Sequence, residues 1–162
     1  MKHLARILIA FAVVSCALLP ASGASAKATR IPFTGTEWCD EDTVGLVRDW
    51  VSGPNYHARG LSQTCYETAT IPEMTGTLYV YDVLFNEFGN SGEGGVTGKL
   101  RFVSDEGGEF LGSWTWGRDD VGPTAVGHGV GKYQGLELHW FLDESGVPTI
   151  FSGYILDPGS GH

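Results

Sequence analysis

The stretch VGHGVGKYQGLELHWFL, residues 126–142, predicts a complete β-hairpin and largely decides the fold. With Gln134-Gly135 as a two-residue turn, Lys132 would face Glu137 as a cross-strand ion pair on the outer side. The inner side sets small residues against large ones, with Gly127, Gly129, Gly131 and Tyr133 opposite Leu136, Leu138, Trp140 and Leu142. Strand glycines opposite bulky side chains are typical of tightly curved sheets, so the hairpin predicts a barrel wall.

Segments rich in β-forming residues and separated by turn residues continue on both sides of the hairpin. No segment shows a sustained 3.6-residue apolar period, so the sequence predicts an all-β fold. The 24 glycines and the sequential hairpins favour a single antiparallel up-and-down barrel of eight or nine strands over a β-sandwich. The other expected strands are Ile31–Cys39, Leu46–Val51 (a strand or a single helical turn), His57–Glu67, Gly76–Asn86, Val96–Val103, Phe110–Trp116 and Pro148–Leu156.

The N-terminus has the pattern of a secretory signal peptide. A basic start precedes an apolar run over residues 7–19, and Ala24-Ser25-Ala26 forms an A-x-A cleavage site. The apolar run is shorter than the ~20 residues that cross a bilayer as a helix. Cys16 offers a lipoprotein alternative, which the better A-x-A site outweighs. We therefore expect residues 1–26 to be removed and residues 27–162 to form one domain, secreted to the periplasm or outside the cell.

The chain is acidic, with a formal net charge of −9 at pH 7. It shows no basic stripe, and nucleic-acid phosphates require clustered Lys and Arg, so nucleic acid is not an expected partner. No second apolar run predicts a membrane span after cleavage, and no motif indicates a cofactor. A homo-oligomer is compatible with the sequence.

Two cysteines, Cys39 and Cys65, remain after cleavage. An even pair in an exported chain predicts a disulfide, which would close a loop of roughly 25 residues and contribute about 3 kcal/mol in the chain-entropy model. A reactive thiol or a metal site is the alternative. A metal site is disfavoured because neither cysteine belongs to a CxxC motif or has a histidine nearby, so none is expected.

The segment Gly129-Val-Gly-Lys-Tyr-Gln-Gly-Leu136 resembles the glycine-rich penultimate hairpin of the allene oxide cyclase-like barrels, a group similar to the dirigent proteins. His57-Ala-Arg-Gly60 is similar to a feature of bacterial members. The resemblance implies an eight-stranded, calycin-like barrel with one end open to a mostly apolar cavity. It also implies cyclisation or coupling of a flexible hydrophobic substrate, but no motif here matches the plant cyclase's catalytic residues.

The richest aromatic set consists of Trp114, Trp116, Tyr133 and Trp140. If these side chains line a cavity, they would stack on a hydrophobic ligand. The alternative is that they form the core of a small barrel, whose interior is often filled by side chains. The leading hypothesis is accordingly a secreted barrel that binds a small hydrophobic molecule. A cyclase or isomerase, and a non-catalytic structural or interaction barrel, are the alternatives.

A possible catalytic group consists of Glu37, His57 and Arg59, because a Cys39–Cys65 link would bring their strands together. A buried carboxylate beside Arg or His would serve as a general acid or base. The alternative is a structural ion pair at a barrel end.

Two further histidines, His128 and His139, lie in the hairpin but do not face each other in the expected register. Both are expected on its outer side, as surface residues rather than metal ligands.

Overall fold

The computed structural model describes residues 27–40, 48–53, 55–88, 95–117 and 122–159. The signal peptide expected at residues 1–26 lies outside these ranges. These ranges contain nine strands and two short 3₁₀ turns, η2 (Pro72–Met74) between β3 and β4 and η4 (Gly131–Tyr133) between β7 and β8. No described helix is long and apolar enough to cross a membrane. The strands are β1 (Thr29–Cys39), β2 (Arg48–Ser52), β3 (Asn55–Ala69), β4 (Gly76–Phe88), β5 (Gly95–Ser104), β6 (Glu109–Gly117), β7 (Thr124–Val130), β8 (Glu137–Asp143) and β9 (Thr149–Asp157).

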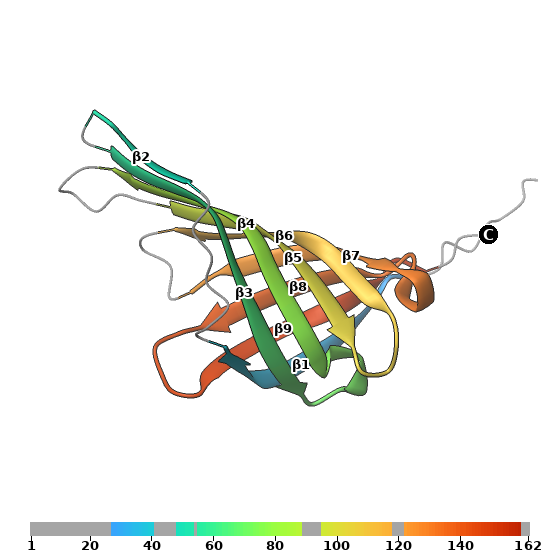
Figure 1. The fold of residues 1–162 in the computed structure, drawn as a ribbon. Coiled ribbons are helices and arrows are strands. Elements are labelled where there is room, and N and C mark those ends of the chain that lie inside the picture. Colours follow the sequence, from blue (N-terminus) through green and yellow to red (C-terminus); the bar gives the residue numbers. More distant parts are fainter. Residues whose placement is uncertain (1–26, 41–47, 54, 89–94, 118–121, 160–162) are drawn as a thin grey trace, which may run out of the picture.

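Eight of these strands form a closed antiparallel barrel (Figure 1). From β3 to β9 each strand pairs with the next in the chain, and β1 closes the ring by pairing with β9 on one side and β3 on the other. The expected all-β, up-and-down barrel is confirmed. The described part of the stretch expected as a strand or a single helical turn belongs to strand β2, whose one partner among the described residues is β3.

Strand β2 and the adjoining parts of β3 and β4 extend beyond the barrel as an arm (Figure 1). Irregularities in the pairing separate the arm from the barrel, at Arg59–Gln63 in β3 and at Tyr81–Leu84 in β4. Asp82 sits in the second irregularity with a φ of 55°. Such bulges bend a strand and change which side its side chains face. Residues of β3 before and after the bulge therefore do not share one continuous inner face.

One end of the barrel is packed closed by the two 3₁₀ turns. Met74 of η2 and Tyr133 of η4 are both buried, and the Tyr133 ring stacks on Phe110 with centroids 5.1 Å apart. The Tyr133 hydroxyl donates a hydrogen bond of 3.0 Å to Ser104 Oγ. The buried polar groups of this end therefore have partners, as burial requires.

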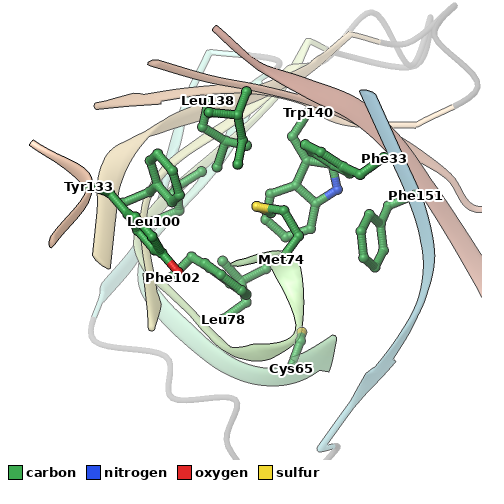
Figure 2. Close-up of a cluster of buried hydrophobic side chains, with 12 residues drawn as sticks. Phe33, Cys65, Met74, Leu78, Leu100, Phe102, Tyr133, Leu138, Trp140 and Phe151 are labelled. Carbon is green, nitrogen blue, oxygen red and sulfur yellow. The ribbon is translucent and has the colours of Figure 1, made fainter. Parts of the chain in front are cut away.

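Alternating inward residues fill this half of the barrel. Figure 2 shows Met74, Phe102 and Trp140 pointing toward one another inside the ring of strands, and the rings of Phe102 and Trp140 meet edge to face at 6.4 Å. Small residues make room for these rings: a Cβ on Gly153 would overlap both the Phe33 ring and the backbone of β8. A strand glycine thus lies beside bulky rings in the barrel wall, as tightly curved sheets require.

The hairpin of β7 and β8 differs in register from the expectation. Gly127 pairs with Leu138, and the connection is longer than a two-residue turn because η4 precedes Gln134-Gly135. The Gly129 N–H donates to the Leu136 carbonyl to close this loop. Tyr133, Leu138 and Trp140 are nevertheless all buried.

The expected Lys132–Glu137 ion pair is wrong as a result of this register. His128 is paired with Glu137, while the Lys132 ammonium lies 3.8 Å from Glu106 of the β5–β6 turn. The observed pairing of β7 with β8 is shifted from the expected register by an even number of residues, so each side chain keeps its expected side of the sheet.

Candidate functional site

The other end of the barrel contains a cavity of about 640 Å³. Its rim includes Pro123 and the β8–β9 connection, where Val147 is fully exposed. Its floor includes Leu100 and Trp140, which belong to the packed core. This volume falls within the roughly 300–1,000 Å³ of small-molecule sites. The barrel is therefore solid at one end and hollow at the other.

The cavity wall is mostly apolar and aromatic. Trp114 and Trp116 come from successive inward positions of β6, and Trp140 comes from β8. Ala125 of β7 pairs with both Trp114 and Trp140, so a small residue separates two large ones. The remaining wall is largely aliphatic, including Leu78, Val80, Leu100 and Leu142.

Gly98 of β5 sets the position of the Trp114 indole. The two residues are paired across β5 and β6, and a Cβ on Gly98 would overlap the indole at its Nε1 edge. The absence of a side chain lets the ring lie flat against the wall.

Two indole N–H groups at the wall, those of Trp114 and Trp140, are buried without a hydrogen-bond partner among the described residues. An unpaired buried donor costs about 1–3 kcal/mol, so such groups are uncommon in a finished core. Both residues line the cavity. Neither nitrogen is accessible to water, so an acceptor on a ligand would satisfy them only if the rings turned toward it.

A pair of carboxyl groups lies at the seam between β1 and β3. Glu37 is directly opposite Glu67 in the register, and both are buried, with 8% and 2% of their surface exposed. Glu37 lines the cavity. Three of the four carboxyl oxygens, Glu37 Oε2 and both of Glu67, have no donor among the described residues.

Burial raises the pKa of both groups above the ordinary carboxyl value. For Glu67 the charge of the neighbouring Glu37 adds to the increase. For Glu37 the charge of Glu144 in the β8–β9 loop raises the pKa further. Two negative charges facing each other in a buried site repel, so the form in which both groups are ionised is disfavoured and a proton is retained. The pair therefore shares a proton as one coupled unit.

The Cys39–Cys65 disulfide predicted from the sequence is present next to this pair. Cys39 Sγ lies 3.4 Å from Glu37 Oε1, but a disulfide sulfur has no proton to donate. Glu37 and the two cysteines also form a compact group of metal-type ligands. Because the sulfurs are bonded to each other, this group supplies no thiolate of the kind a zinc site uses.

The expected aromatic set is divided between the two ends of the barrel. Trp114, Trp116 and Trp140 line the cavity, whereas Tyr133 is packed into the closed end with its hydroxyl on Ser104.

The expected group of Glu37, His57 and Arg59 is not brought together. Arg59 is exposed and pairs with Arg48 and Leu84 in the arm, before the bulge of β3. His57 pairs with Trp50 and Asn86 further along the arm, and its side chain lies outside the described part of the structure. The partner that β3 supplies to Glu37 is Glu67.

Both hairpin histidines lie on the outer side of the barrel as expected. His128 is exposed, and His139 stacks on Tyr154 with ring centroids 4.5 Å apart. His139 Nε2 is 3.1 Å from a Glu137 carboxyl oxygen on the same strand. Neither residue lines the cavity.

Comparison with known proteins supports the fold. The structure is similar to that of a protein of unknown function from the DUF3224 family of Shewanella oneidensis MR-1, with a TM-score of 0.58. The match has 12% sequence identity and covers 80% of this chain and 96% of that chain. No protein-family model matches the sequence, and no curated protein matches it. At this identity the likeness shows a shared barrel fold and says nothing about activity.

Proposed function

We propose that this protein is a binding protein that holds a small, largely apolar molecule in the cavity at the open end of the barrel. The main observation in support is the cavity of about 640 Å³, whose lining includes Trp114, Trp116 and Trp140. Its few polar groups, two unpaired indole N–H groups and Glu37, would orient a ligand that carries an oxygen acceptor.

The Cys39–Cys65 disulfide supports a place of action outside the reducing cytoplasm, in keeping with the expected signal peptide. We therefore include in the proposal that the protein is secreted. N-terminal sequencing of the exported protein should find Lys27 as its first residue, and retention of residues 1–26 would contradict it.

A pair of variants on β7 tests the binding function. Ala125→Phe places a ring in the cavity between Trp114 and Trp140, whereas Val126→Phe adds the same ring on the outer side of the barrel. An apolar dye that fluoresces on leaving water should bind the wild type and Val126→Phe equally, and Ala125→Phe at least about tenfold more weakly. Equal binding by the two variants would place the dye elsewhere and remove the cavity from the proposal.

A second candidate function is acid–base catalysis, as a cyclase or isomerase of the allene oxide cyclase-like kind. The observation in its favour is the proton-sharing pair Glu37–Glu67 beside an apolar cavity, since a carboxyl group with a raised pKa is suited to proton transfer near neutral pH. Conversion of an unsaturated apolar epoxide by the wild type but not by Glu37→Gln would support it. Unchanged turnover in Glu37→Gln would remove the pair from any catalytic role.

A further inference from the structure

The charged residues around the cavity are all acidic within the described part of the chain. Glu37 and Glu144 line it, and no Lys, Arg or His is among the described lining residues. Glu144 is exposed in the β8–β9 loop and close enough to Glu37 to influence it electrostatically. A second carboxyl group, Glu67, is buried opposite Glu37 on β3 and is not among the described lining residues. The cavity therefore presents carboxyl groups from its mouth to its wall.

These carboxyl groups lack the cation that buried acids normally have. Glu37 is more than nine-tenths buried, faces the cavity, and its Oε2 has no partner among the described residues. By contrast, Glu109 at the surface is paired with Arg101 through two hydrogen bonds of 2.7 and 2.9 Å. Unpaired buried acids are expensive, so an absent cationic partner is the natural complement of this site.

The tryptophan wall suits the same partner. Among side-chain rings the face of an indole attracts a cation most strongly, and where water is excluded the interaction is worth about 2 kcal/mol. Trp140 has only 2% of its surface exposed, and Trp114 and Trp116 lie beside it on the wall. Aromatic faces and carboxyl groups together favour an organic cation over a neutral or anionic molecule of the same shape.

Resting on the proposed binding function, we propose that the ligand class is an organic amine. Its ammonium group is held at Glu37, which lines the cavity and faces the second carboxyl group, Glu67, across the strands, and its apolar body lies against Trp114 and Trp140. An ammonium ion donates the hydrogen bonds that the carboxyl oxygens lack, and its charge offsets theirs. An oxygen on the body would accept from the indole N–H groups.

Proton release follows from this arrangement. The pair Glu37–Glu67 shares a proton when the cavity holds no cation, and an ammonium ion beside it favours the form without that proton. The titratable groups that act on Glu37 are Glu67 of β3 and Glu144 of the β8–β9 loop. Binding of an amine should therefore release a proton to solvent and strengthen as the pH rises, while the amine itself stays protonated.

The test compares two probes of matched shape by isothermal titration calorimetry. These are 2-(4-methoxyphenyl)ethylamine and 2-(4-methoxyphenyl)ethanol, which share an ether oxygen and differ at one end. We expect the amine to bind at least about tenfold more tightly than the alcohol at pH 7.5. Its Kd should fall as the pH rises from 5.5 to 8, whereas that of the alcohol should stay constant. This pH series uses the wild type alone and needs no variant to fold.

Two variants test whether the tighter binding of the amine depends on the buried carboxyl groups. Glu37→Gln/Glu67→Gln keeps the shapes and removes the charges, so the ratio of the two Kd values should fall to about one. Asp105→Asn, an exposed position in the β5–β6 turn, removes a surface charge and should change neither probe. An amine advantage that survives the double substitution, or falls equally in Asp105→Asn, would overturn the inference.

The outcomes also separate the inference from the proposed function. If the alcohol binds in the cavity and the amine binds equally or more weakly, the amine class is wrong and the binding function stands. If neither probe binds while the apolar dye still binds Val126→Phe more tightly than Ala125→Phe, the amine class is wrong and the binding function stands; if the dye also binds the two β7 variants equally, both are overturned.

Discussion

The two ends of the barrel are built from the same strands but differ in how completely they are packed and hydrogen bonded. At the closed end Met74, Phe110 and Tyr133 fill the interior, and the Tyr133 hydroxyl has a partner. At the open end a cavity remains, and Glu37, Trp114 and Trp140 keep polar atoms without partners among the described residues. Packing and hydrogen bonding at the closed end therefore stabilise the fold, whereas the open end retains the space and the unpaired polar atoms that a ligand would use.

The largest expected effect comes from truncating a ring at the closed end. Phe110→Ala should lower the free energy of unfolding by about 3–5 kcal/mol, because Phe110 is fully buried and its loss leaves a cavity under Tyr133. Leu142→Ala, at the half-buried cavity wall, should cost less than about 2 kcal/mol. Urea denaturation measures both, and equal losses would contradict the division into a packed end and a hollow end.

Next in size is the disulfide at the seam of the barrel. Replacing Cys39 and Cys65 together by Ala should cost about 3 kcal/mol, since the unfolded chain regains the freedom of the closed loop. Reduction of the wild type should lower the denaturation midpoint to a similar extent. If the double variant unfolds at the wild-type urea concentration, the link contributes nothing to stability.

A pH effect of intermediate size should arise from Glu37 and Glu67. Burial raises their pKa, so the folded state holds a proton more tightly than the unfolded state, whose carboxyl pKa is about 4.5. Their contribution to stability is then fully present below pH 4.5 and declines as the pH rises toward the raised folded value. One pKa unit corresponds to about 1.4 kcal/mol, so a decline of ~1–3 kcal/mol between pH 5 and 8 is expected.

Glu67→Gln should flatten this decline and leave the protein more stable than the wild type at pH 8. Denaturation curves at pH 5 and pH 8 measure the change. Glu109→Gln is the matched control, because the hydrogen bonds from Arg101 lower the pKa of Glu109 and its titration lies below this range. A wild-type decline that persists unchanged in Glu67→Gln would show that other groups cause it.

The smallest expected effect concerns the hydroxyl that completes the closed end. Tyr133→Phe keeps the ring on Phe110 and removes the hydrogen bond to Ser104, which should cost about 1 kcal/mol. Tyr79→Phe, at an exposed position on β4, should be neutral. Binding of the apolar dye at the open end should be the same in both variants, and a loss in Tyr133→Phe would mean that the ends are coupled.

The alternation of residues along β7 and β8 was enough to predict the barrel and its aromatic interior. The hairpin register was wrong by an even number of residues, which leaves every side chain on its expected side. Sequence alone could not reveal the longer connection, because η4 forms only where Tyr133 finds Phe110 and Ser104 inside the closed end. Packing against residues of other strands therefore determines the length of the connection between β7 and β8.

The candidate site was less predictable, since it depends on pairings between distant strands. Bulges in β3 and β4 separate Arg59 and His57 from the barrel, and neither bulge has a strong sequence signal. Glu67 was missed, although a signal for it existed. Cys39 pairs directly with Cys65, and moving two residues back along β1 and two forward along β3 places Glu37 opposite Glu67. A cross-strand disulfide predicted from sequence thus also predicts which residues of the two strands lie opposite each other.

The position of β1 in the ring also sets the order in which the barrel can assemble. From β3 to β9 each strand finds its partner close by in the sequence, but β1 must wait for the last strand, because Ile31 pairs with Ile155. Contacts between such distant segments form late and slowly, since a long loop must close first. The pairing of Cys39 with Cys65 spans a far shorter loop, so the first strand can be anchored to β3 before its other neighbour exists.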